Sequence, residues 1–259
     1  MSIPFLKEIQ IRFFRIGRAI FAFAIGILVL LVPLGAHAQL RPAPVGGHRA
    51  VVVDERLAVL RDEASLSARL LKRLSRGRKV SLMNIKRSPE GVMFYRVAVT
   101  RRTRGWLQVE AVVSAARHRD DERLVNLIRA SKDFDRVARA SIFLNTFPGS
   151  VFRPSVLLIL GATAEDVARK LSVEAARRLD EVEMKANRAP MLSYFLNYNG
   201  LDRYRRLGIA FIFDQRMKTY HYNGAAWREI VRRYPQSEEA EKAREQLEVL
   251  KVADRSRLR

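Results

Sequence analysis

The sequence predicts an α+β protein with a small β-barrel followed by an all-α domain of helical hairpins. Apolar residues recur with the two-residue period of strands from residue 49 to about residue 113, and with the period of helices after Ala115. A basic and then apolar start is typical of an exported precursor. We therefore expect a signal peptide at residues 1–38, a Pro/Gly linker at 39–48, the β-domain at 49–116 and the helical domain at 117–259.

The first 38 residues have the three parts of a signal peptide. Basic residues precede an uncharged run from residue 19 to residue 40, and Ala36-His37-Ala38 offers small residues at the two positions that a signal peptidase reads. Cleavage there would place the protein in the periplasm or outside the cell. The alternative is a single N-terminal anchor in the inner membrane, because the uncharged run is just long enough to span a bilayer. The absence of Cys excludes an acylated lipoprotein and any disulfide.

The net charge of +21 is shared by both predicted domains. Residues 49–116 contain 15 basic and six acidic side chains, a net charge of +9, and residues 117–259 contain 28 and 20, a net charge of +8. A basic surface attracts polyanions, although an Arg-rich composition without a specific partner gives the same charge. For an exported protein the available polyanions are wall polymers, lipopolysaccharide and anionic lipid headgroups, so nucleic acid is not the expected partner.

Several short strands are predicted in the β-domain, and the clearest four can be given bounds. Residues 50–53 are a β-branched run, and a strand at 80–85 precedes the turn signal Ser88-Pro89-Glu90-Gly91, after which an alternating segment follows at 92–100. A polar turn at 101–105 then leads to a last strand at 106–113. Short strands at this spacing favour a small barrel or sandwich.

The helical domain is predicted from apolar residues spaced three and four apart. Thr163 is expected to cap one helix, a helical pattern runs from residue 191 to residue 222 with breaks at Asn199-Gly200 and Gly208, and Ser237 is expected to cap the last helix. The segments 147–150 and 234–237 share an aromatic–Pro–x–Ser pattern, in which Pro ends one helix and Ser begins the next.

Residues 49–113 resemble a bacterial SH3-like domain. The matching stretches are LAVLRDE at 57–63, LLKRLSRGRKV at 70–80 and the closing Arg104-Gly105-Trp106-Leu107, with Ala64 where the family usually has Pro. Residues 224–250 are similar to the final helix pair of tetratricopeptide-like envelope proteins, through the joint Tyr234-Pro235-Gln236-Ser237. These resemblances imply an SH3-like barrel that binds wall material and a tetratricopeptide-like part that binds a protein.

Two groups of candidate binding residues lie in the β-domain. The first is a basic run, which is either a solvated face or an anion site: Arg69, Lys72, Arg73, Arg76, Arg78 and Lys79. The second is Trp106, which either lines a peptide groove with Phe94 and Tyr95 or packs beneath the barrel. We expect Trp106 to be buried beneath the barrel.

A third group lies in the helical domain, at the aromatic and amide-rich corner from residue 194 to residue 206. Its candidate residues are Tyr198, Asp202, Arg203 and Tyr204. Stacking and bidentate hydrogen bonding there would suit a sugar, a peptide carboxylate or a partner loop. The alternative, which we favour, is a helix–turn–helix corner whose tyrosines belong to the core.

The sequence contains no assembled catalytic constellation. It has no Cys, its four His residues lack the i, i+4 spacing of a helical metal-ligand pair, and no nucleophile-elbow or phosphate-loop motif occurs. We expect no cofactor and no metal. The predicted function is non-enzymatic binding or scaffolding in the cell envelope. The alternative is a wall-active hydrolase whose catalytic carboxylates lie in the helical domain, since two placed carboxylates leave no sequence signature.

Cleavage after Ala38 predicts that the mature protein begins at Gln39. N-terminal sequencing of the exported protein tests this prediction. Recovery of the uncut chain in the membrane fraction would instead support the anchor.

Overall fold

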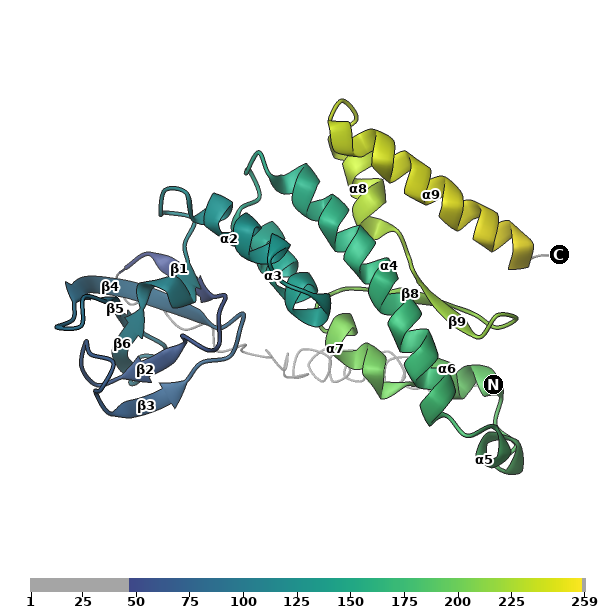
Figure 1. The fold of residues 1–259 in the computed structure, drawn as a ribbon, viewed down its shortest axis with the longest axis horizontal. Helices are drawn as coiled ribbons and strands as arrows, with labels where there is room; N and C mark the ends of the chain where they lie inside the picture. The colour runs from purple at the N-terminus through teal and green to yellow at the C-terminus, as the bar shows by residue number, and fades with distance from the viewer. Residues whose placement is uncertain (1–46, 258–259) are drawn as a thin grey trace, which may run out of the picture. The chain divides into compact units, whose positions relative to one another are not determined.

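The computed structural model describes residues 47–257, which belong to one compact unit. The predicted signal peptide and most of the predicted linker therefore lie outside the described residues. No helix in the described part of the chain has both the length and the apolar character to cross a membrane. The protein is α+β, with an antiparallel sheet followed by helices (Figure 1).

The sheet has seven antiparallel strands in the order β3-β2-β6-β5-β4-β1-β7. Their bounds are Arg49–Val52 (β1), Val59–Arg61 (β2), Leu70–Arg73 (β3), Lys79–Arg87 (β4), Met93–Ala98 (β5), Arg104–Gln108 (β6) and Val112–Val113 (β7), with a 3₁₀ turn, η1, at Val109–Ala111. The strands at 50–53, 80–85 and 92–100 are thus confirmed with small shifts. The predicted last strand at 106–113 is instead divided into β6, the turn η1 and β7, which pairs with β1. Leu60, Val97 and Leu107 are completely buried on the inner face of the sheet.

Gly105 allows β6 to lie close to β2. A Cβ atom at this position would stand 2.5 Å from the carbonyl oxygen of Arg61 and 2.8 Å from the Leu60 side chain. A side chain on residue 105 would therefore separate the two strands that pair through Arg61 and Trp106.

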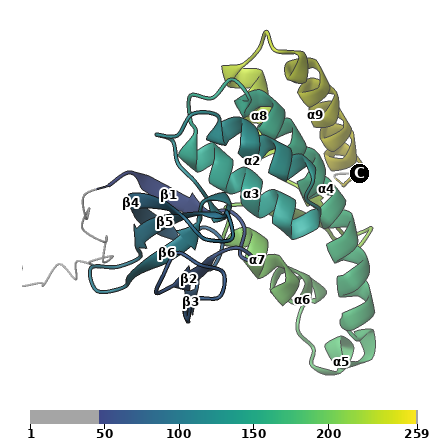
Figure 2. The ribbon, with the colours of Figure 1, turned by 60° about the vertical axis from the view of Figure 1, so that its left-hand side comes forward.

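Helix α4 is the central element of the helical part (Figure 1). The bounds of the α-helices are Asp120–Arg129 (α2), Asp133–Thr146 (α3), Arg153–Arg178 (α4), Glu181–Ala186 (α5), Met191–Leu196 (α6), Asp202–Arg205 (α7), Ala225–Arg233 (α8) and Glu238–Arg257 (α9), with a 3₁₀ turn, η2, at Asn199–Leu201. Helix α4 packs against α3 on one side and against α8 and α9 on another. Figure 2 shows α5 and α6 beside the C-terminal end of α4.

Two expectations about the helical part are wrong. Residues 211–222 form an antiparallel hairpin, β8 (Phe211–Asp214) and β9 (Thr219–Tyr222), so the domain is not all-α. Thr163 lies within α4 rather than at its start, and its hydroxyl donates to the Ile159 carbonyl at 2.7 Å. The helix begins ten residues earlier because Pro154 at its first turn suits a helix start.

Trp227 fixes α8 on α4. Its side chain is 1% exposed and lies against Gly161, where a Cβ atom would come within 2.2 Å of the indole Nε1. The ring of Tyr222 meets the indole edge-on, with centroids 5.4 Å apart. Gly161 is therefore needed for close contact between the two helices.

A buried guanidinium joins the sheet to the helices. Arg139 of α3 is 5% exposed, and its Nε donates to the Val53 carbonyl at 3.1 Å while its Nη1 donates to the Ser131 hydroxyl at 2.5 Å. The Asp54 carboxylate lies 3.8 Å from its Nη2. Burial lowers the pKa of Arg139 from its ordinary value. Val53 and Val113 extend the apolar core of the helices into the sheet around this contact.

A second contact of this kind lies where the sheet leads into α2. The buried Asp120 accepts a hydrogen bond from the Ser114 backbone N–H at 2.8 Å. Arg123 donates to Asp120 at 3.3 Å and to the Glu110 carbonyl at 3.0 Å. The first turn of α2 is therefore held to the last strands of the sheet by charged hydrogen bonds.

We expect Arg139→Met to lower the free energy of unfolding by about 1–3 kcal/mol, because it leaves the buried Val53 carbonyl without its donor. Chemical denaturation of the mature protein measures this change. The control is Arg129→Met, at an exposed position in the last turn of α2, which should change stability by less than about 0.5 kcal/mol. Equal effects of the two substitutions would contradict the assigned role of Arg139.

Candidate functional site

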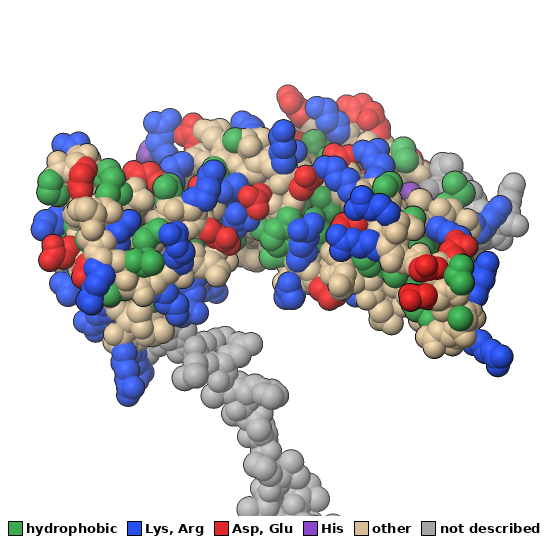
Figure 3. All heavy atoms as spheres, turned by 60° about the horizontal axis from the view of Figure 1, so that its bottom comes forward, with side chains coloured by type: hydrophobic (Ala, Val, Ile, Leu, Met, Phe, Trp, Pro, Cys, Tyr) green, Lys and Arg blue, Asp and Glu red, His purple; other side chains and the backbone are tan. Residues whose placement is uncertain are grey.

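The strands of the sheet carry positive charge and no negative charge. All seven strands lie in the described part of the chain, and none contains Asp or Glu. They contain nine basic residues: Arg49, Arg61, Lys72, Arg73, Lys79, Lys86, Arg87, Arg96 and Arg104. Figure 3 shows Lys and Arg side chains spread over one face of this part of the molecule. The acidic residues of the sheet region therefore lie in its loops and turns.

The strand register places Trp106 between two arginines. Trp106 of β6 pairs with Arg61 of β2 on one side and with Arg96 of β5 on the other. Directly paired residues project from the same face of a sheet, with Cβ atoms about 4.5–5.5 Å apart. Arg104 shares that face, because it lies two residues before Trp106 on β6. We call the surface formed by Arg61, Arg96, Arg104 and Trp106 the Trp106 face.

The Trp106 face is the outer side of the sheet. Gly105 and Leu107 are buried on the inner side, whereas Trp106 is half-buried and Arg96 and Arg104 are exposed. The expectation that Trp106 packs beneath the barrel is therefore wrong. Phe94, two residues before Arg96 on β5, lies on the same side as Trp106 and is completely buried, so one end of this side is covered; Tyr95, on the other side, is half-buried. An exposed part of an indole between guanidinium groups can contact both apolar and anionic parts of a ligand.

The loop between β2 and β3 is fastened beside this face. Arg61 donates through Nη1 to the Ala68 carbonyl at 2.5 Å. Glu90, which lies between β4 and β5, contacts the middle of this loop. Its carboxylate accepts hydrogen bonds from the Ser65 hydroxyl at 2.6 Å and from the Leu66 N–H at 3.2 Å. Hydrogen bonds from Ser65 and Ser88 lower the pKa of Glu90 to about 2. The Glu90 carboxylate is thus charged at neutral pH, and it holds the loop between β2 and β3 in place.

The basic run predicted from the sequence is divided by the structure. Arg69 pairs with Asp62 at 3.1 Å, and Arg76, whose side chain is largely buried, pairs with Asp135 of α3 at 2.8 Å. Arg78 is exposed and donates to the Val99 carbonyl at 3.4 Å. Lys72, Arg73 and Lys79 are exposed on strands β3 and β4. Arg76 is therefore part of the contact between the sheet and α3, and Arg69 is paired with Asp62. Lys72, Arg73 and Lys79 have no ion-pair partner among the described residues.

Arg73 is one member of that run that lies on the side of the Trp106 face. It pairs with Val59 on β2, two residues before Arg61. Arg61, Arg96 and Arg104 were missed as site residues. The alternation of β5 in the sequence indicates that Arg96 faces away from Val97, but the pairing of Arg96 with Trp106 depends on strand register, which depends on contacts distant in sequence.

The four candidates of the helical part do not form one site. Tyr204 is buried, and its hydroxyl accepts a hydrogen bond from Arg203 at 3.1 Å. The Arg203 guanidinium lies over the rings of Phe134 and Tyr204, 5.1 and 4.9 Å from their centroids. Asp202 pairs with Arg205 at 3.5 Å. Arg203 and Tyr204 thus pack α7 against Phe134 of α3, whereas Asp202 pairs within α7.

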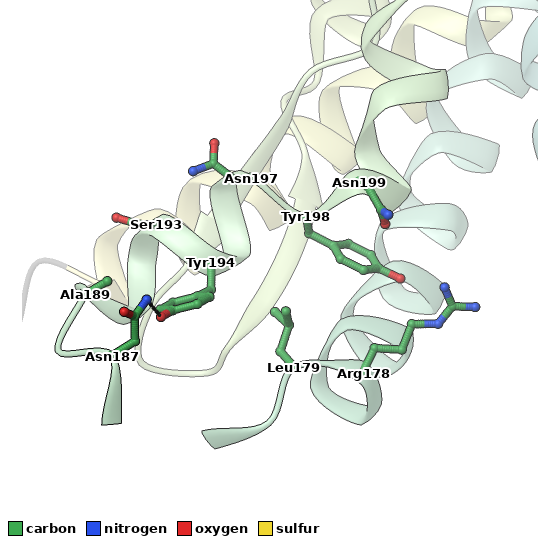
Figure 4. A pocket seen from close by; sticks show the side chains of 9 residues that line it. All are labelled: Arg178, Leu179, Asn187, Ala189, Ser193, Tyr194, Asn197, Tyr198 and Asn199. Atoms are coloured by element: carbon green, nitrogen blue, oxygen red, sulfur yellow. Dashed lines mark hydrogen bonds between the residues drawn. The ribbon is translucent and has the colours of Figure 1, made fainter. Parts of the chain in front are cut away.

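Tyr198, in contrast, lines a hollow beside the C-terminal end of α4 (Figure 4). The hollow has a volume of about 510 Å³ and is lined by Arg178, Leu179, Asn187, Ala189, Ser193, Tyr194, Asn197, Tyr198 and Asn199. The Asn187 amide donates to the Tyr194 hydroxyl at 2.7 Å. Burial raises the pKa of Tyr198, and the nearby Glu174 carboxylate adds to this effect.

His221 pairs with a carboxylate in the helical part. Its Nδ1 lies 3.1 Å from Glu165, and the same carboxylate accepts the Tyr222 backbone N–H at 2.7 Å. Glu165 thereby ties the β8–β9 hairpin to α4. The described residues contain no group of three or more His, Cys, Asp or Glu side chains placed to hold a metal ion.

Comparison with known proteins gave no match to a family model, to a curated protein or to a solved structure.

We expect Trp106→Ala to lower the free energy of unfolding by about 1 kcal/mol, because the indole is only half-buried. The matched change of its neighbour, Leu107→Ala, should cost about 2–5 kcal/mol, since Leu107 is completely buried. Thermal or chemical denaturation of both variants measures the difference. A loss for Trp106→Ala as large as that for Leu107→Ala would contradict the placement of Trp106 on the outer face.

Proposed function

We propose that this protein is an exported, non-enzymatic binding or scaffold protein of the cell envelope. In this proposal the sheet is an SH3-like barrel that binds wall peptide or an anionic envelope polymer through the Trp106 face. The observation that carries the proposal is the row Arg61–Trp106–Arg96, set in strands that contain no acidic residue.

The chemistry of the Trp106 face suits a ligand with repeated negative charges. Arg96 and Arg104 are exposed and take part in no ion pair within the described residues, so they can meet a ligand without first losing a carboxylate partner. Guanidinium groups bind carboxylate and phosphate through paired hydrogen bonds. The half-buried indole adds a rigid apolar contact between them, which suits an extended peptide or polymer rather than a free inorganic ion.

The helical part is proposed to bind a protein partner. The support is the helix pair α8 and α9, which meet at the joint Tyr234-Pro235-Gln236-Ser237 in the manner of tetratricopeptide-like envelope proteins. The Ser237 hydroxyl has no hydrogen-bond partner among the described residues, so the expected side-chain cap of α9 is not formed. The likeness therefore depends on the helix pair and on Pro235, which ends α8.

A wall-active hydrolase remains the second candidate. It requires two carboxylates facing one cleft, with separations of about 5–10 Å between them. The lining of the hollow beside α4 consists of amide, hydroxyl, apolar and guanidinium side chains. That lining favours binding over hydrolysis for this hollow.

The double substitution Arg96→Gln and Arg104→Gln should lower the fraction of protein that cosediments with purified wall sacculi several-fold at about 50 mM salt, because exposed charges act over about a Debye length. Raising the salt to about 500 mM should reduce binding of the unchanged protein to the same level.

The control is Arg129→Gln with Arg232→Gln, which removes the same charge from exposed positions of α2 and α8. This control should bind as the unchanged protein does. Salt-independent binding, or an equal loss in both double variants, would contradict a specific role of the Trp106 face.

A further inference from the structure

Another hollow of the helical part lies between the β8–β9 hairpin and α9. Ile212 and His221 line it from the hairpin, and Leu247, Leu250 and Lys251 line it from α9. Its volume of about 390 Å³ is within the range of about 300–1,000 Å³ that is usual for small-molecule sites. We call this hollow the α9 slot.

The slot exists because α9 is longer than its neighbour α8. Helix α9 has 20 residues and α8 has nine. Leu250 lies against the start of α8, since a Cβ atom on Gly224 would stand 2.9 Å from its Cδ1 atom. The C-terminal turns of α9 therefore extend past α8 (Figure 1), which leaves room between α9 and the hairpin.

The walls of the slot are largely aliphatic. Ile212 pairs with His221, so both project from the same face of the hairpin, and Ile212 is 46% exposed. Leu247 and Leu250 lie three residues apart on the inner side of α9, and both are half-buried. An alkyl chain that covered these three apolar side chains would remove their exposed surface from water.

A guanidinium lies beside these walls. Arg228, near the start of α8, donates through Nη1 to the Asn223 carbonyl at 2.7 Å, and it takes part in no ion pair within the described residues. A Cβ atom on Gly224 would stand 3.2 Å from this Nη1 and 3.2 Å from the Cδ2 atom of Leu247. The guanidinium and the leucines of α9 thus meet above the same glycine. One ligand can therefore contact them with a charged group and an apolar chain together.

The charges of the slot favour an anion. Its lining contains the basic residues Arg228 and Lys251 and neither Asp nor Glu among the described residues. Two carboxylates beside the lining are already engaged, because Glu165 lies 3.1 Å from the Nδ1 atom of His221 and Glu248 pairs with Lys251 at 2.6 Å. Arg228 therefore remains for a ligand, and a guanidinium binds both carboxylate and phosphate groups.

An alkyl chain suits the slot better than a peptide does. Both oxygen atoms of Asn223 already accept hydrogen bonds from the protein. The outer edge of β9 is also occupied, since the Tyr220 and Tyr222 N–H groups donate to side chains of α4. A peptide would bring backbone N–H groups to a lining with few free acceptors, whereas an alkyl chain needs none.

We propose that the α9 slot binds a single-chain anionic amphiphile, with its head group on Arg228 and its alkyl chain against Ile212, Leu247 and Leu250. A fatty acid and a monoalkyl phosphate both have this chemistry. The site is separate from the Trp106 face and does not depend on the function proposed for that face.

Isothermal titration of the mature protein with decanoate and with decyl phosphate, both below the concentration at which micelles form, tests the proposal and distinguishes the two head groups. We expect at least one of them to bind at a single site per chain. The hexyl homologue should bind more weakly, because each methylene group that becomes buried strengthens binding by up to about fourfold. Decyltrimethylammonium should bind much more weakly, since it places a cation beside Arg228.

Arg228→Gln should weaken binding of the anion about tenfold, through loss of a charged hydrogen bond. Ile212→Thr, which keeps a β-branched residue at an exposed strand position, should weaken it several-fold through loss of apolar contact. The matched control is Lys242→Gln, which removes the same charge from an exposed position of α9 outside the slot. This control should bind the anion as the unchanged protein does.

Absence of binding by both decanoate and decyl phosphate would overturn the proposal, and so would equal affinities of the Arg228→Gln and Lys242→Gln variants. Binding of the cationic amphiphile as tightly as the anion would show that Arg228 does not select the head group, and would also overturn it. The sheet variant Arg96→Gln/Arg104→Gln should bind the amphiphile normally, so failure at the slot is distinguishable from failure at the Trp106 face.

Discussion

The guanidinium of Arg139 is the contact through which the sheet and the helices become one unit. It lies where β1 ends, and it connects the Val53 carbonyl to Ser131 between α2 and α3. Water is excluded there by the apolar residues Val53 and Val113, so the charge depends on hydrogen bonds from the protein. Arg76, which pairs with Asp135, reinforces the same junction from the sheet side. The Trp106 face and the helical hollow are therefore held by one connected scaffold.

Helix α4 has the corresponding role within the helical part. Its middle receives Trp227 at Gly161, Glu165 in its next turn anchors the β8–β9 hairpin, and its C-terminal end borders the hollow. The stack of Phe195, Phe213 and Tyr220 connects α6 to that hairpin, with the first two rings 4.4 Å apart. The residues that line the hollow come from the end of α4, from α6 and from the connections on either side of α5 and α6.

The sequence predicted four of the strands and the longer helices, because their apolar residues repeat often enough to define a period. The short strands β2 and β3 and the short helix α5 were not predicted. The β8–β9 hairpin was missed since each strand has four residues, and Phe211 continues the helical spacing of Tyr204 and Leu207. Trp106 was misplaced because a strand sequence does not show which face meets the core. The hollow beside α4 is visible only in the structure, because its lining includes residues from α4 to η2.

The distribution of charge in the sheet also affects how two copies of the protein meet. Strand β3 lies at the end of the sheet order, and all four of its side chains are exposed, including Leu70 and Leu71. Such an edge is open to pairing with the same edge of another molecule, which leads to aggregation. Lys72 and Arg73 place like charges along it, so two such edges repel each other. The basic side chains of β3 thus oppose pairing between the edges of two sheets.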